Sequence, residues 1–250
     1  MTDERDDDNG QPRESGVGPE PDPLRETYRA SVSESTAVLE GLTPQNVALL
    51  VIDLQQLDAT PGVGVFEHNR SGLPSQSEEY YFDTLETQVL PNVAGLQACF
   101  RERGLEVIHT RIQSLTLDGR DRSPAHKRLG LHAPPNSRES RFLEAVAPLE
   151  NEIVINKTAS GVFASTNLEY VLRNLGIRGL FVTGVYTNEC VSSAVRSASD
   201  LGFHVTLVQD ACATVTADLQ ASSIRVLRDR YARVMRTNGV LREIRRLCGR

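Results

Sequence analysis

Three separate apolar runs of the chain each lead to a residue that could take part in nucleophilic catalysis. Asp53 ends the run 49–53, Lys157 ends the run 153–157, and Cys190 follows shortly after the run 180–184. The carboxyl ends of parallel strands meet at one edge of a sheet, where open α/β sheets bind ligands. An acid, an ammonium and a thiol that lie 104 and 33 residues apart can therefore converge there. A thiol beside a base is a nucleophile for acyl transfer.

The segment 184–191 places Cys190 where a strand is expected to turn into a helix. A helix start offers unpaired N–H groups and a positive dipole end, and both favour thiolate over thiol. We expect this position and Lys157 to lower the thiol pKa from its usual value near 8.5. Taken singly, each residue also has a structural explanation: Cys190 as a small buried hydrophobe, Asp53 as a turn cap, and Lys157 as a solvated strand end.

Short apolar runs alternate with longer helical patterns from residue 47 onward, which predicts an α/β fold with a parallel sheet covered on both faces. Glycines 104, 176 and 202 fall just past predicted helix ends. Two Pro/Gly/Ser-rich stretches, 61–77 and 133–140, are expected to be loops over the site. The predicted strands are 47–53, 105–110, 152–156, 180–184, 204–209 and 233–236, and the predicted helices are 84–103, 167–175, 189–201, 219–231 and 238–247.

The formal charge of −6 resides in the amino-terminal part of the chain. Residues 1–40 hold 11 acidic and 4 basic side chains, a net of −7, which leaves 22 acids and 23 bases, a net of +1, for residues 41–250. A segment this polar and acidic does not offset the entropy of ordering, so residues 1–20 are expected to be disordered. We therefore predict an acidic tail over 1–40 and one domain over 41–250.

Cysteine usage and hydropathy favour a soluble protein of the cytoplasm. Four cysteines in 250 residues, at positions 99, 190, 212 and 248, show no metal-type spacing and do not form a disulfide framework. No apolar run approaches the length of a membrane span or follows a basic start. Eight arginines lie between residues 225 and 246, with Tyr231 as the single aromatic residue among them and no recognisable nucleic-acid-binding motif. We therefore expect neither a membrane nor a nucleic acid as partner.

Three segments carry a resemblance to a known family. Residues 50–55 (LVIDLQ), 156–163 (NKTASGVF) and 184–191 (GVYTNECV) resemble, in order and spacing, the three signature blocks of isochorismatase-like cysteine hydrolases. The resemblance implies a three-layer α/β/α sandwich, a mostly parallel sheet of about six strands, and Asp53, Lys157 and Cys190 as a catalytic triad. It also implies a dimer or tetramer, and a cis peptide bond between Val185 and Tyr186.

The family includes nicotinamidases and carbamoylsarcosine, ureidoacrylate, biuret and triuret amidohydrolases. We therefore predict hydrolysis of a C–N bond in a small linear amide or ureido compound through a thioester on Cys190. Backbone N–H groups at a strand-to-helix turn can stabilise an oxyanion. The amides of Tyr186 and Cys190 are the predicted donors.

The remaining predictions concern the substrate. Nicotinamidases share a metal-binding Asp-x-His arrangement after the second strand, and the segment 108–114 of this chain lacks it. We therefore expect neither a metal nor a cofactor. His109 is expected in the core, and His126 and His132 lie in a loop without ligand-like spacing. The predicted substrate contacts are Arg111, Gln113, Phe163 and Tyr186, with residues 58–67, Tyr80 and Tyr81 as further pocket walls. Arg111 and Gln113 would suit a carbonyl-rich or carboxylate-bearing substrate.

Three other functions remain open from the sequence. Hydrolysis of the vinyl ether of isochorismate is known in the family. The members that perform it share the absence of the cysteine, so Cys190 argues against this function. A non-catalytic binding or scaffold protein could use the acidic tail to dock a partner, although it has no chemical need to retain Asp53, Lys157 and Cys190. A redox role for Cys190, with Cys212 as the second thiol, is the third.

Overall fold

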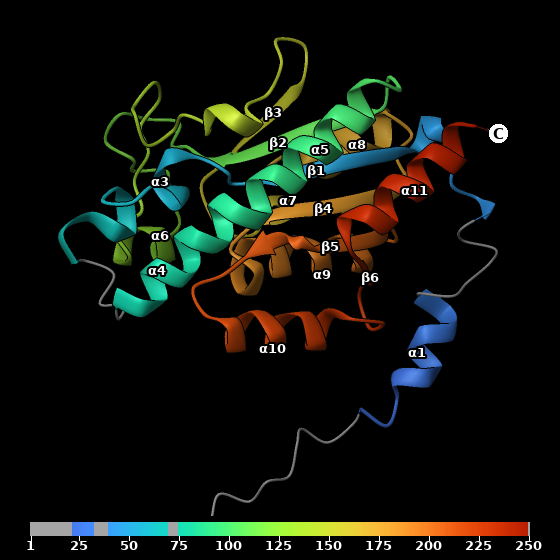
Figure 1. The fold of residues 1–250 in the computed structure, drawn as a ribbon. Coiled ribbons are helices and arrows are strands. Elements are labelled where there is room, and N and C mark those ends of the chain that lie inside the picture. The colour runs from blue at the N-terminus through green and yellow to red at the C-terminus, as the bar shows by residue number, and fades with distance from the viewer. Residues whose placement is uncertain (1–21, 33–39, 70–74, 250) are drawn as a thin grey trace, which may run out of the picture.

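The computed structural model describes residues 22–32, 40–69 and 75–249. Its centre is a six-stranded parallel sheet in the order β3-β2-β1-β4-β5-β6, with helices on both faces (Figure 1). The predicted fold class is confirmed. The strands are β1 (Val47–Ile52), β2 (Glu106–Ile112), β3 (Ile153–Lys157), β4 (Gly179–Val185), β5 (His204–Ala213) and β6 (Arg233–Met235).

Alternate residues of β1 enter two separate hydrophobic cores. Leu49 and Val51 belong to the core on one face of the sheet, whereas Leu50 and Ile52 belong to the core on the other. All six residues of this strand are buried. A strand buried on both faces reads as a continuous apolar run, which is why the sequence indicated β1 and β4 clearly.

The helices divide between the two faces (Figure 1). One face is covered by α4 (Ser75–Thr84), the π-helical turn η3 (Leu85–Val89), α5 (Leu90–Arg101) and α11 (Thr237–Cys248). The other is covered by α8 (Leu168–Asn174), α9 (Ser192–Asp200) and α10 (Ala217–Leu227). Shorter elements connect them: η1 (Pro44–Asn46), α3 (Gln56–Ala59), η2 (Gly64–Asn69), α6 (Pro124–Arg128), η4 (Glu144–Val146), α7 (Val162–Ser165) and η5 (Thr187–Val191).

Several predicted boundaries differ from the structure. The strand predicted over 204–209 extends to Ala213, because an irregularity after Val182 lets Cys212 pair with Gly184. The helix predicted over 219–231 spans Ala217–Leu227 instead. The short elements α3, η2, α6 and α7, and the helix α4 within and after the predicted loop 61–77, were not predicted. Their conformations depend on contacts with the sheet and with one another more than on local sequence pattern.

Glycines at helix ends follow the prediction: φ is +65° at Gly104, +70° at Gly176 and +83° at Gly202. Among the described residues of the predicted acidic tail, Arg25–Val32 form the helix α1, while the disorder predicted for 1–20 falls outside the described residues. None of the helices in the described part of the chain is long and apolar enough to cross a membrane.

Candidate active site

Asp53 follows the central strand β1 and is held in a fixed orientation. Its φ is +54°, a left-handed conformation that aspartate tolerates better than most residues. Its backbone N–H donates to the carbonyl of Thr110 (3.1 Å), and the Thr110 hydroxyl donates to Asp53 Oδ1 (2.9 Å). Since the Asp53 side chain is only 1% exposed, water contributes little to its solvation. The carboxylate therefore depends on protein partners.

Lys157, the last residue of β3, connects the other two predicted catalytic residues. Its ammonium lies 2.8 Å from Asp53 Oδ2 and donates to Cys190 Sγ (3.3 Å) and to the carbonyl of Ala159 (3.1 Å). The side chain is fully buried. All three donor positions of the ammonium are thus occupied.

Cys190 lies in η5, the π-helical turn that leads from β4 into α9. The carbonyl of Tyr186 accepts from the N–H groups of Glu189 (3.1 Å) and Val191 (3.2 Å), which fixes the turn around the thiol. The Val185–Tyr186 bond is cis, as the resemblance implied. The structure therefore brings Asp53, Lys157 and Cys190 together at one edge of the sheet.

A glycine makes the close approach of β4 to β1 possible. Gly184 lies opposite Ile52, and its φ of +114° is a conformation that L side chains rarely adopt. A Cβ atom there would overlap the backbone carbonyl of Ile52. Since Ile52 immediately precedes Asp53, this contact sets the spacing between the strand that carries the carboxylate and the strand that leads to the thiol.

The expectation that Cys190 has a lowered pKa is wrong. Burial raises the pKa of its thiol, the ammonium of Lys157 partly opposes that rise, and the nearby Asp53 carboxylate adds to it. Burial alone would lower the pKa of Lys157, but the charge of Asp53 beside it raises that pKa overall. The resting site therefore holds a thiol and an ammonium, and Cys190 must lose its proton during the reaction.

A cavity of about 260 Å³ opens beside Cys190 at the carboxyl ends of β1 and β4. The sheet order changes direction between these two strands, which is where open α/β sheets bind ligands. The volume lies near the lower end for small-molecule sites. Besides Tyr186 and Cys190, the polar lining consists of Asp58, His126, Ser160, Asn188, Glu189 and Thr214, and the apolar lining includes Phe66 and Ile112.

Only one of the four predicted substrate contacts lines the cavity. Tyr186 lines the cavity, whereas Arg111, Gln113 and Phe163 do not. Arg111 donates to the side chain of Asn156 (2.8 Å) and to the carbonyl of Ser140 (3.0 Å). Gln113 is buried beyond β2. Their predicted role is corrected: a residue at the end of an inner strand can be turned toward a neighbouring loop instead of the cavity.

Aromatic residues also differ from expectation. Phe163 packs against the ring of Phe203 in the core behind the sheet. Tyr81 is fully buried and donates to the backbone carbonyl of Asp58 (2.7 Å), and Tyr80 lines a different pocket. The predicted wall segment 58–67 does contribute Asp58, Gly64, Val65 and Phe66 to the cavity.

The three histidines considered from the sequence differ in whether they line the cavity. His109 is fully buried, as predicted, and its Nε2 lies 3.2 Å from Glu152. His126, which we predicted in a loop without ligand-like spacing, is 1% exposed and lines the cavity. His132 is in the same loop but not in the lining. In the described part of the chain, no cluster of three or more His, Cys, Asp or Glu could hold a metal, and all four cysteines are free.

A match to a family model complements this geometry. Residues 47–239 match the isochorismatase domain, which covers every strand and the three converging residues. The chain belongs to the isochorismatase family. The predicted resemblance is confirmed, and the protein is an isochorismatase-family hydrolase.

Individual relatives agree with this assignment. The chain is 31% identical to the uncharacterized isochorismatase family protein YddQ of Bacillus subtilis, over 77% of this chain and 92% of that protein. It is 25% identical to the maleamate amidohydrolase of Pseudomonas putida, over 81% and 88%. The crystal structure of a cysteine hydrolase from Pseudomonas syringae has the same fold, with a TM-score of 0.70 and 20% identity, over 82% of this chain and 95% of that one.

Asp58 offers a prediction that is independent of the substrate. Burial, reinforced by the charge of Asp53, raises its pKa well above 3.8. Above pH 3.8 the unfolded chain has lost this proton while the folded protein keeps it, so the folded state loses stability at about 1.4 kcal/mol per pH unit until its own pKa is reached. Asparagine does not titrate. We expect Asp58→Asn to gain stability over the natural protein, progressively from about pH 4 toward neutrality.

Urea unfolding at a series of pH values between 4 and 8 measures this difference. Glu189→Gln, which removes the exposed carboxylate of another residue that lines the same cavity, is the matched control. A difference between Asp58→Asn and the natural protein that stays constant with pH would show that Asp58 ionises normally in the folded state.

Proposed function

We propose that this protein is a cysteine-dependent amidohydrolase that cleaves the C–N bond of a small linear amide or ureido compound through a thioester on Cys190. The observation that carries this proposal is the buried chain of contacts from Asp53 through Lys157 to Cys190, directly beside a cavity. The maleamate amidohydrolase among its relatives adds support for amide hydrolysis.

The first half of the reaction forms the thioester. Asp53 accepts the thiol proton while Cys190 Sγ bonds to the carbonyl carbon of the substrate, and Lys157 stabilises the negative charge at both groups. The tetrahedral oxyanion is proposed to accept hydrogen bonds from the backbone amides of Tyr186 and Cys190. Asp53 then returns the proton to the leaving nitrogen, the C–N bond breaks, and ammonia or an amine leaves.

The second half regenerates the thiol. Asp53 removes a proton from a water molecule, whose oxygen attacks the thioester carbon. The C–S bond breaks, the proton passes to the sulfur, and a carboxylic acid is released. The sum is amide plus water to acid plus ammonia or amine. A raised thiol pKa fits this scheme, because the proton needs to leave Cys190 only as the carbon–sulfur bond forms.

The test is ammonia release by the full chain and its Cys190→Ala variant from biuret, triuret, ureidoacrylate, carbamoylsarcosine, nicotinamide and maleamate, with and without EDTA. We expect release that EDTA does not affect and that falls to background in the variant. Cys99 is buried in the core on one face of the sheet, so Cys99→Ala is the matched control and should retain turnover. An acyl adduct on Cys190, seen by mass spectrometry after rapid quenching, would identify the thioester directly.

Release that persists in Cys190→Ala would refute the thioester mechanism. If the natural protein releases nothing from any compound and forms no adduct, the scaffold alternative becomes the better explanation. The expected cytoplasmic location and homo-oligomeric assembly stay predictions, which fractionation of cells and light scattering can address.

A further inference from the structure

Two buried side chains in the cavity carry polar atoms that have no hydrogen-bond partner within the described protein. Asp58 is 3% exposed and its Oδ2 atom makes no hydrogen bond, and His126 is 1% exposed with both ring nitrogens unpaired. Both residues line the cavity beside Cys190. Buried polar groups in folded proteins nearly always have a partner, so an unmatched pair in a cavity indicates groups arranged for a ligand.

The position of Asp58 is fixed by its backbone. Its carbonyl accepts hydrogen bonds from the hydroxyls of Tyr81 (2.7 Å) and Tyr186 (3.0 Å), whose rings pack 5.2 Å apart. These bonds anchor the main chain and leave the side chain unpaired. Burial raises the pKa of the carboxyl group, which favours its protonated form, and a protonated carboxyl group offers one O–H donor and one carbonyl acceptor.

The position of His126 is fixed by the helix α6. Ser123 caps this helix by accepting from the N–H of His126 (3.1 Å), and the N–H of Ser123 donates to the carbonyl of Thr158 (2.9 Å), the residue after Lys157. Burial lowers the pKa of His126 to about 4, and the charge of Lys157 adds to this. The neutral imidazole therefore presents one donor and one acceptor.

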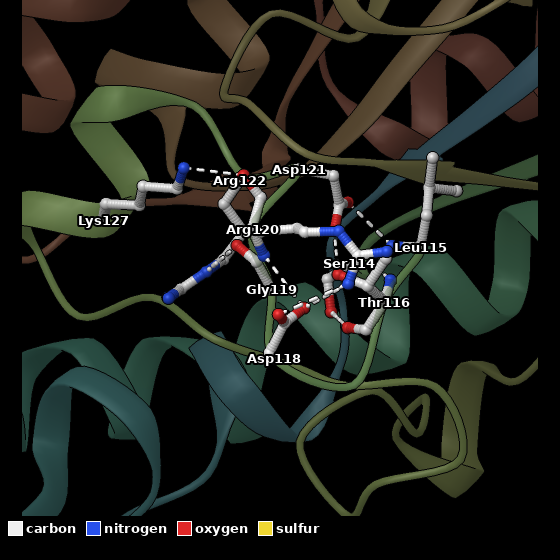
Figure 2. Close-up of polar contacts among 9 residues, drawn as sticks. All are labelled: Ser114, Leu115, Thr116, Asp118, Gly119, Arg120, Asp121, Arg122 and Lys127. Atoms are coloured by element: carbon white, nitrogen blue, oxygen red, sulfur yellow. Dashed lines mark hydrogen bonds and ion pairs between the residues drawn. The ribbon is translucent and has the colours of Figure 1, made fainter.

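The loop that leads into α6 is braced by its own polar contacts (Figure 2). Asp121 accepts from the N–H groups of Leu115 (2.7 Å) and Thr116 (3.2 Å), and Lys127 donates to the carbonyl of Arg120 (2.6 Å). A braced loop presents His126 at a defined position, which reduces the entropy lost on binding.

We propose that Asp58 and His126 bind the non-reacting end of a small uncharged substrate that carries a second amide or ureido group. An amide presents an N–H donor and a C=O acceptor side by side. A neutral carboxylic acid can match both at once, and a neutral imidazole can either donate to the C=O group or accept from an N–H group. This inference rests on the proposed function, because it assumes that the reacting carbonyl lies at Cys190.

The charges around the cavity favour an uncharged compound over a carboxylate. Asp58 and Glu189 are the acidic residues of the lining, and among its described residues there is no lysine or arginine. Lys157 is occupied by three contacts, and Arg122 near His126 donates to the carbonyls of Gly119 and Leu131. A substrate carboxylate would be desolvated without a cationic partner, which is strongly unfavourable.

The experiment compares matched substrates that differ in one group: succinamide against succinamate, and maleamide against maleamate. We expect kcat/KM to be at least tenfold higher for each diamide. Asp58→Leu and His126→Leu should each raise KM for the diamide by about 10- to 100-fold, because a site group is lost and the substrate amide is left unpaired. Asp58→Asn and His126→Gln keep a donor and an acceptor and should raise KM less.

Two controls separate binding from folding and chemistry. His132→Leu changes a histidine of the same loop that does not line the cavity, and its KM should match that of the natural protein. The rate at which methyl methanethiosulfonate modifies Cys190 should be similar in Asp58→Leu, His126→Leu and the natural protein. A changed rate would show that the substitution disturbs the thiol itself.

Preference for the monoamide acids, or an unchanged KM in both leucine variants, would overturn the inference. Turnover lost in Asp58→Asn as fully as in Asp58→Leu would instead indicate an ionised Asp58 and a cationic substrate. If the natural protein hydrolyses none of these compounds, the proposed function fails separately. Calorimetric titration of Cys190→Ala with succinamide and succinamate then tests the inference alone, since tighter binding of the diamide that depends on Asp58 would support it and equal binding would refute it.

Discussion

Replacing Lys157 by methionine is expected to remove hydrolysis and to lower the free energy of unfolding by about 3–5 kcal/mol. Methionine fills a similar volume but leaves the Asp53 carboxylate buried without its ionic partner, with the Thr110 hydroxyl as its remaining side-chain donor. Breaking one half of a buried ion pair is costly because the other charge stays in a low-dielectric interior. Urea unfolding at neutral pH and ammonia release measure the two effects.

A double variant provides the matched control. Asp53→Asn combined with Lys157→Met removes both charges, so it should regain most of the lost stability while remaining inactive. That result would show that the ion pair, rather than the shape of either side chain, accounts for the destabilisation. Equal losses of stability in the single and the double variant would contradict the assigned pairing.

Replacing Gly184 by alanine is expected to cost about 3 kcal/mol or more and to reduce turnover. The added Cβ would meet the backbone of Ile52, which has no rotamer to change, and the residue would have to keep a φ of +114°. Either β4 moves away from β1 or the residue leaves this conformation. Both responses displace Asp53 from the turn that carries Cys190. Thermal unfolding and kcat/KM on the same samples measure the outcome.

Gly176→Ala separates backbone conformation from crowding. Gly176 also has a positive φ, +70°, but a Cβ there would meet nothing within 4 Å. We expect a cost of about 1–2 kcal/mol from the left-handed conformation alone and no change in turnover. If the two alanine variants lose the same stability, contact with Ile52 plays no part and the account of strand spacing is wrong.

The reactive groups could be predicted because they depend on sheet geometry. Apolar runs of strand length locate β1, β3 and β4, and parallel pairing then places Asp53, Lys157 and Cys190 at one edge. The thiol pKa could not be predicted in the same way. Its direction depends on how completely Cys190 is buried, and burial outweighs the charge of Lys157.

The walls of the cavity were harder to predict because they are formed by loops held through distant contacts. The Gln55 side chain donates to the carbonyls of Ile112 (3.0 Å) and Glu139 (2.9 Å), residues 57 and 84 positions away. Asp58 and His126 are placed by tyrosine hydroxyls and by a helix cap, respectively. No local pattern of apolar residues encodes such contacts, so the sequence indicated Asp58 only as part of the wall segment 58–67 and gave His126 no place in the cavity.

The cavity walls and the reacting groups occupy different stretches of the chain. The thiol, the carboxylate and the ammonium are fixed by strands and by the turn η5, whereas Asp58 and His126 lie on α3 and α6, which Figure 1 shows at the same end of the sheet. Codon changes confined to 56–66 and 115–140 would therefore alter what the cavity admits and leave the three reactive atoms in place. Descendants of one ancestral gene can thus acquire different substrate ranges while the hydrolytic residues stay unchanged.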